Sequence, residues 1–177
     1  DIANTDIAEL KKNDKVKTSV VTSMGLVGLI IQTRDPLLQN VKLRQAMAAA
    51  IDSKELVGAV TDGIGSPNNS IVPALSAYYG PVQKQGWKHD PAAAKKLLAE
   101  AGYKGEKIVM LANKRYPESF DAAVVAQQML QAVGFNIEIE VQEWATQLDR
   151  YSKGNYTIQA FPYSGRIDFV EPEGAGT

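Results

Sequence analysis

Apolar residues recur along much of the chain at steps of three and four, the spacing of one face of a helix. On this basis the helix from 118 to 133 is expected to bury Val125, Met129, Ala132 and Val133. The full set of segments with this period predicts helices at 5–13, 41–51, 53–62, 91–101, 118–133 and 144–151.

Other segments are rich in Val, Ile, Thr and aromatic residues, which is typical of strands. The clearest is 135–141, where Phe135, Ile137, Ile139 and Val141 alternate with polar residues. This period of two indicates a half-buried strand. Further strands are expected at 16–23, 26–33, 108–111 and 156–163.

Several residues mark where the helices begin and the chain turns. Asp52 is followed three residues later by Glu55, which is the pattern of a capping box. Asp90 followed by Pro91 is a second strong helix start. Gly, Pro, Asn and Ser concentrate between 63 and 80 and predict a long loop.

From 108 to 163 the predicted order is strand, helix, strand, helix, strand, which implies parallel neighbours with helices over the sheet. Together with the earlier elements this predicts an α/β fold with a central mixed sheet covered by helices. We assign 1–168 to this α/β unit. Residues 169–177, which end in EPEGAGT, are expected to be a disordered or added tail.

Composition removes several classes of function. The 177 residues include 19 Lys and Arg against 20 Asp and Glu, so there is no basic excess for a broad nucleic-acid surface. There is no Cys and one His, His89, which excludes thiol chemistry and His-rich metal sites. We therefore expect no metal, no cofactor and no nucleic-acid partner. The longest apolar run, 25–31, is far shorter than the roughly 20 residues of a membrane span.

Features that would indicate an enzyme are weak. His89 has no nucleophile or orienting group in its sequence neighbourhood, and a lone His beside a helix start is usually a surface residue. Glu138 and Glu140 lie on the polar face of an alternating strand, where carboxylates are usually solvated. The glycines at 63 and 65 follow a helix and lack the Lys of a phosphate loop. We expect no catalytic residue.

Two segments are better placed to bind a ligand, because α/β sheets bind ligands at the carboxyl ends of their strands. Arg115 and Tyr116 follow the strand at 108–111, where an Arg can hold a carboxylate with two hydrogen bonds. The alternative is a solvent-facing Arg before a helix that starts at Pro117, and the residues alone leave both open.

The second segment contains Tyr163, Arg166 and Asp168, after the last predicted strand. Arg166 and Asp168 are also compatible with a simple surface ion pair, worth under about 1 kcal/mol. The two segments together are more suggestive than either alone, because the strands before them can be neighbours in the sheet.

Four segments also match, in order, the motifs of a known family. VKLRQAMAAAID at 41–52 resembles VRQAxxxAID, and DPAAAKKLLAEAGY at 90–103 resembles DPxxAKxLLxEAGY. The segment 126–137 is similar to AxxxQxxLxxxGIxV, and YSGRID at 163–168 resembles GWSGRxDP. These are motifs of the family 5 solute-binding proteins, the dipeptide-, oligopeptide- and nickel-type receptors of ABC importers.

The resemblance implies one lobe of a two-lobed, type II periplasmic-binding-protein-like fold, in which ligand is enclosed between the lobes. The matched part is the second, C-terminal lobe, so we expect the first lobe and the end of the second to be missing from this chain. It implies a solute-binding component of an ABC importer that captures a peptide or another small solute, and not an enzyme. It also implies a periplasmic or extracytoplasmic location and a membrane permease as partner of the full-length protein.

The resemblance assigns roles to some residues. Arg115 and Tyr116 match the loop whose Arg holds the peptide carboxylate in dipeptide-binding members. Arg166 stands where those members have an Asp that meets the ligand amine, and Asp168 lies two residues further on. A cation at this place disfavours a free amine and suits an acidic or otherwise non-standard ligand. The rival interpretations are a stand-alone α/β protein-interaction domain, with self-association through the exposed lobe face, and a hydrolytic enzyme domain.

Overall fold

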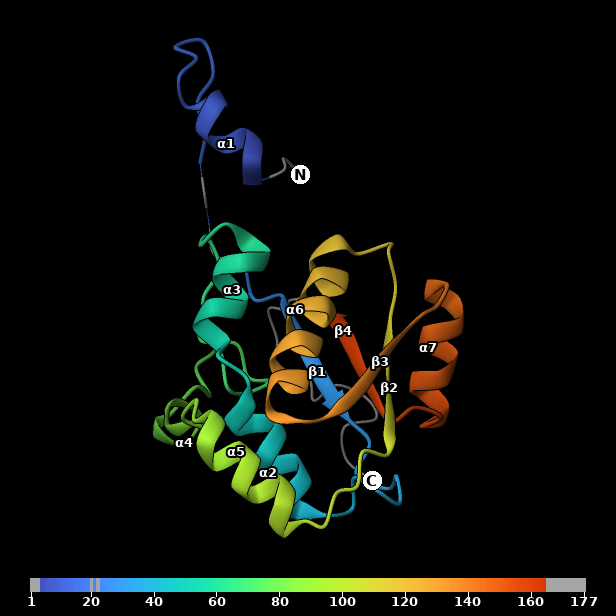
Figure 1. The fold of residues 1–177 in the computed structure, drawn as a ribbon. Coiled ribbons are helices and arrows are strands. Elements are labelled where there is room, and N and C mark those ends of the chain that lie inside the picture. The colour runs from blue at the N-terminus through green and yellow to red at the C-terminus, as the bar shows by residue number, and fades with distance from the viewer. Residues whose placement is uncertain (1–3, 20, 22, 165–177) are drawn as a thin grey trace.

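The centre of the protein is a four-stranded mixed sheet with the strand order β1-β4-β2-β3 (Figure 1). The structure is a computed structural model that describes residues 4–19, 21 and 23–164. The last strand, β4, is antiparallel to β1 and parallel to β2, and β2 is parallel to β3. The predicted mixed sheet is therefore confirmed. The strands are β1 (Leu26–Ile31), β2 (Lys107–Ala112), β3 (Asn136–Val141) and β4 (Ile158–Tyr163).

The predicted helices are present, and those after Asp52 and Asp90 begin at the expected caps, whereas the first runs from Asn4 to Leu10 and not over 5–13. Asp52 accepts hydrogen bonds from the backbone N–H groups of Lys54 and Glu55, and Asp90 accepts one from that of Ala93. The long loop at 63–80 is followed by a short helix that the periodicity did not predict. The helices are α1 (Asn4–Leu10), α2 (Val41–Ala50), α3 (Ser53–Thr61), α4 (Pro81–Gln85), α5 (Pro91–Glu100), α6 (Pro117–Val133) and α7 (Trp144–Lys153).

The strand expected at 16–23 was wrong. The described residues of this segment have no strand conformation, and Val16 and Val21 are exposed. Val and Thr favour strands chiefly because they pack well on a half-buried pleated surface. Here β1 takes β4 as its neighbour, and the segment before it lies on no such surface.

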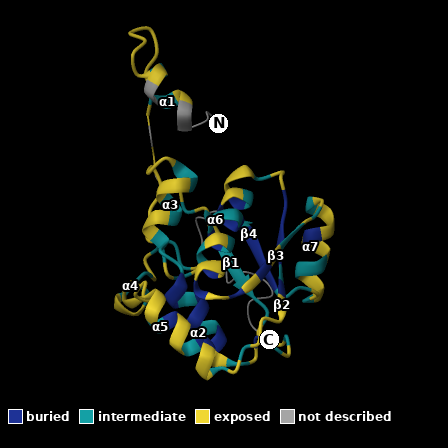
Figure 2. Cartoon of the chain, viewed as in Figure 1, coloured by how far each residue is buried: buried dark blue, intermediate teal, exposed yellow. Residues whose placement is uncertain are grey.

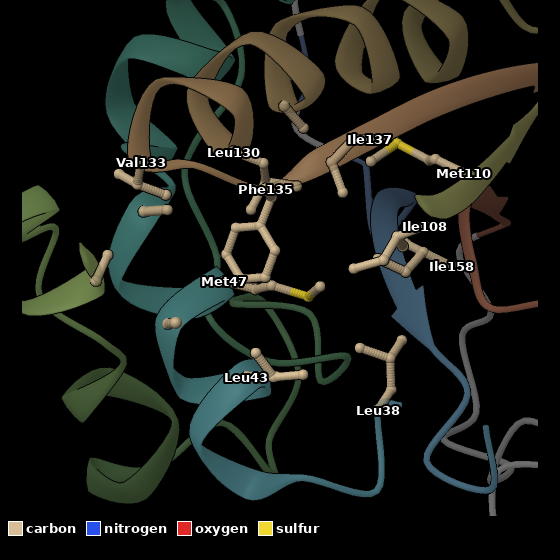
Figure 3. Packing of buried hydrophobic residues seen from close by; sticks show 14 of the residues in the cluster. Leu38, Leu43, Met47, Ile108, Met110, Leu130, Val133, Phe135, Ile137 and Ile158 are labelled. Carbon is tan, nitrogen blue, oxygen red and sulfur yellow. The ribbon is translucent and has the colours of Figure 1, made fainter. Parts of the chain in front are cut away.

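One face of the sheet carries the main apolar core. Helix α6 lies on this face, α2 and α5 pack against α6 and against each other, and buried residues are concentrated there (Figure 2). Figure 3 shows Met47 of α2 against the ring of Phe135, and Ile108 of β2 beside Ile158 of β4. Burying one such side chain stabilises the fold by about 1.5–3 kcal/mol, so this layer is the main source of stability.

The face that α6 buries differs from the predicted one. Ala132 is exposed and Val125 and Met129 are only half-buried, although Val133 is buried as expected. The helix is apolar around much of its circumference, so its period alone did not identify the inward face. Small side chains bring the helix close to the sheet: the buried residues are Ser119, Ala122, Ala123, Ala126, Leu130 and Val133.

The opposite face of the sheet is covered by α7 (Figure 1). Side chains alternate along β4, so Ile158 and Ala160 join the main core whereas Gln159 and Phe161 point to the other side. Gln147 of α7 is buried and bonds to Gln159 and to the carbonyl of Ala160. The second layer is therefore polar and aromatic where the first is aliphatic.

The two ends of β3 offer a direct test of where the core lies. Ile137 is 2% exposed whereas Val141 is 49% exposed, although the alternation placed both on the buried face. We expect Ile137→Ala to lower the free energy of unfolding by about 2–5 kcal/mol. Val141→Ala should cost under about 1 kcal/mol. Urea denaturation followed by circular dichroism measures both, and equal losses would contradict this description of the core.

Candidate ligand-binding site

The loop after β2 and the end of β4 at Tyr163 lie at the same edge of the sheet. β2 and β4 run parallel as direct neighbours, with Met110 opposite Ile158 and Leu111 opposite Gln159. The loop that follows β2 and the chain that follows Tyr163 therefore leave the sheet on the same side. The expectation that these two strands are neighbours is confirmed.

The loop after β2 is closed by its own hydrogen bonds. The side chain of Asn113 accepts from the backbone N–H of Tyr116 at 3.2 Å. Tyr116 precedes the first turn of α6, and its carbonyl accepts from the N–H groups of Ser119 and Phe120 at 3.0 and 3.1 Å. Pro117 occupies the first helical position, where a missing N–H does no harm.

Arg115 presents its guanidinium group to solvent from this loop. Its Cζ atom lies 6.0 Å from the centroid of the Tyr116 ring, and the residue is exposed. None of the ion pairs formed among the described residues includes Arg115. Its planar fork of N–H donors is thus available to an incoming carboxylate.

Five aromatic side chains run from the loop after β2 to Tyr163 at the end of β4, and we call them the aromatic row. The ring of Tyr116 meets Trp144 edge-on with centroids 4.9 Å apart, and Trp144 lies 5.2 Å from Phe161. Phe161 lies 5.3 Å from Tyr163 and 4.6 Å from Tyr151. Each such pair adds about 0.5–1.5 kcal/mol beyond its buried area, so the row fixes α7 on the sheet.

Tyr163 lies at the end of this row, half-buried, with its hydroxyl 3.3 Å from that of Tyr151. Burial is the main cause that raises the pKa of Tyr163 well above its usual value, and the neighbouring Tyr151 adds to it. The phenol is neutral at physiological pH and can both donate and accept a hydrogen bond.

The structure therefore brings Arg115, Tyr116 and Tyr163 to one edge of the sheet. Arg166 and Asp168, the other two candidates, lie outside the described residues, and their roles stay predictions. The assigned boundary at 168 and the expected tail at 169–177 lie outside them as well.

The periodicity placed Trp144, Gln147, Leu148 and Tyr151 together on one helix face but did not connect them with the site. Leu148 is exposed, so it does not share the buried face of Gln147. Asn113 was not singled out. A usable signal was present: a short polar residue directly after a buried strand and three residues before a helix start often closes a turn.

The side chains considered above as catalytic candidates each lie against another ionisable side chain. His89 Nδ1 lies 3.2 Å from Asp52 Oδ2. The pKa of Asp52 is lowered, chiefly by the N–H of Glu55, with His89 contributing less. Glu138 and Glu140 form ion pairs with Lys107 and Arg150, at 3.1 and 3.0 Å respectively. Within the described ranges no three His, Asp or Glu side chains are close enough to hold a metal ion.

Comparison with known proteins identifies the family of this chain. Residues 1–172 match the model of the family described as bacterial extracellular solute-binding proteins, family 5 Middle. The chain belongs to this family.

Heme-binding protein A of Haemophilus influenzae is 29% identical over 168 residues, covering 90% of this chain and 30% of the relative. The dipeptide-binding protein of Escherichia coli K12 is 30% identical over 167 residues, covering 90% of this chain and 31% of the relative.

Among solved structures, the dipeptide-binding protein of Pseudoalteromonas sp. SM9913 in complex with Met-Leu superposes with a TM-score of 0.77. It is 27% identical and covers 92% of this chain and 33% of that chain. This family member therefore spans about a third of the length of the relatives that it matches. No helix in the part described by the structure is long and apolar enough to cross a membrane.

The buried phenol of Tyr163 predicts a change of stability with pH. Because the folded state raises the pKa of Tyr163, this contribution to stability is complete below pH 10 and declines as the pH rises further. The melting temperature of the wild type should therefore fall more steeply above about pH 10, the usual pKa of a phenol, than that of Tyr163→Phe. Calorimetry at several pH values measures this, with Tyr78→Phe, which removes an exposed phenol, as the matched control. Parallel curves for wild type and Tyr163→Phe would contradict it.

Proposed function

We propose that this chain forms one wall of the ligand site in the solute receptor of an ABC importer, and that its ligand is a peptide or another small solute with an acidic group. The proposal rests on the guanidinium of Arg115, which is exposed and takes part in none of the ion pairs among the described residues. It lies at the sheet edge where Tyr116 and Tyr163 also lie. These groups are suited to binding a ligand and not to catalysing a reaction. A guanidinium fork orients a carboxylate, and phenol rings offer apolar faces and hydrogen bonds.

The relatives support this interpretation. They include proteins named for binding dipeptides and heme, and one structure holds Met-Leu. A dipeptide has one free carboxylate, the group that an Arg fork matches. The relatives are receptors and not enzymes, which agrees with the structural partners found for His89, Glu138 and Glu140.

The remaining partners belong to the same proposal. In the full-length receptor a first lobe would close over this edge and enclose the ligand, and the closed form would dock on a membrane permease outside the cytoplasm. Self-association through the exposed lobe face stays a prediction. Large exposed apolar side chains do gather in the loop region before α5: Ile64, Ile71, Leu75, Tyr78, Val82 and Trp87.

The role of Arg115 can be tested in the full-length receptor. Arg115→Lys keeps the charge but loses the planar fork, so affinity for a dipeptide such as Met-Leu should fall roughly 10- to 100-fold, the loss expected for a charge-assisted hydrogen bond. Lys114→Gln removes an adjacent positive charge and should change affinity much less. Isothermal titration measures both, with thermal melting as the control for folding. Equal losses in the two variants would indicate long-range attraction and not a specific contact.

The 177-residue chain alone should bind such ligands weakly. Tight sites bury about 70–90% of a ligand, and a single edge of one sheet covers only one side of it. We expect titration of the isolated chain with Met-Leu to show no sub-micromolar affinity. Sub-micromolar binding by this chain would mean that the site is complete without a second lobe.

A further inference from the structure

Two buried amides connect the Arg115 loop to α7. Asn113 at the end of β2 is 1% exposed and Gln147 of α7 is fully buried. Asn113 Nδ2 donates to Gln147 Oε1 at 2.6 Å, and Gln147 Nε2 donates to the carbonyl oxygen of Ala160 at 2.9 Å. On the other side, Asn113 Oδ1 accepts from the backbone N–H of Tyr116. These bonds form one continuous chain from the candidate loop across α7 to the centre of β4.

The direction of every bond in this chain is determined by its two ends. The carbonyl of Ala160 can only accept, so the NH₂ group of Gln147 must face it and its oxygen must face Asn113. The N–H of Tyr116 can only donate, so the oxygen of Asn113 must face the loop. A side chain at each position must therefore both donate and accept, which an amide does and an ionised carboxylate or an apolar side chain does not.

We infer that Gln147 is a positioning residue for the ligand site: it holds Asn113 in the orientation that closes the loop carrying Arg115 and Tyr116. Burying an amide costs free energy unless its hydrogen bonds are made, so the Gln147 side chain has one favourable orientation. Its bond to Asn113 then determines how the Asn113 side chain faces the loop. The ring of Tyr116 against Trp144, which begins α7, provides a second contact between the loop and the same helix. Pre-organising the loop before ligand arrives reduces the entropy cost of binding.

The test follows the amide proton of Tyr116 by hydrogen exchange in the 177-residue chain, which requires no ligand. Gln147→Met has a similar size but removes the side-chain bonds to Asn113, Gln159 and Ala160. The Tyr116 amide should then exchange about 5- to 10-fold faster, as expected for one lost hydrogen bond. Amides in the middle of α6 should keep their rates. Gln127→Met is the matched control: Gln127 also donates from a helix to a strand carbonyl, that of Ile137, which Gln131 continues to satisfy.

A second variant separates positioning from simple packing. In Gln147→Glu the ionised carboxylate cannot donate to Ala160, but the protonated acid can donate there and accept from Asn113 as the amide does. Burial raises the pKa of such a carboxyl group, so protonation should restore the bonds as the pH falls from 8 towards 5. The protection factor of the Tyr116 amide should therefore rise over this range in Gln147→Glu and stay constant in the wild type.

Asn113→Ala completes the design, because it removes the acceptor for the Tyr116 N–H while leaving the bond from Gln147 to Ala160 in place. If Gln147 acts through Asn113, the double variant should exchange at Tyr116 no faster than Asn113→Ala alone. If Gln147→Met fails to fold, Asn113→Ala and the pH series of Gln147→Glu still test whether Gln147 positions Asn113. Unchanged Tyr116 protection in folded Gln147 variants, or an equal increase at all amides, would overturn the inference.

The link from this loop to ligand capture rests on the proposed function, but the exchange measurement does not. If Arg115→Lys left ligand affinity unchanged in the full-length receptor, the proposed function would fail. The coupling of Gln147 to the loop would still be measured independently. Conversely, unaltered exchange would remove the positioning role and leave Arg115 as a ligand contact.

Discussion

The parallel pairing of β2 with β4 is the contact on which the rest of this structure depends. It places the last described strand inside the sheet and brings the loop after β2 and Tyr163, distant in sequence, to one edge. It also separates two different layers. The aliphatic core beneath α2, α5 and α6 supplies stability, whereas the face under α7 carries the amides and rings that fix the geometry of the loops. Displacing β4 would dismantle both layers at once.

Much of this arrangement could be predicted from local signals in the sequence. Asp52 and Asp90 identified helix starts because their side chains bond to backbone groups only two or three residues away. The candidate loop at Arg115 followed from its place after a strand, and the neighbouring strands then brought Tyr163 to it. These inferences depend on contacts close in sequence or on the general topology of α/β sheets.

The features that could not be predicted all depend on a distant partner. The segment 16–23 has strand-forming residues, but its described residues form no strand, and α6 is apolar on more faces than the one it buries. Gln147 looks like an ordinary helix residue until Asn113 and Ala160 are placed around it. Periodicity indicates which residues share one face of a helix or strand. Only the folded structure shows which other residues pack against that face.

The central position of β4 has a consequence for biosynthesis. Leu26 begins the strand whose partner ends at Tyr163, and a ribosome adds about 5–20 residues per second, so the two halves of this ladder emerge roughly 7–27 s apart. During that interval β1 is a nascent strand with both hydrogen-bonding edges open, and β2 and β3 can pair only with each other. Such open edges are sites of aggregation, so the growing chain is vulnerable to aggregation, and dependent on chaperones, until β4 enters the sheet.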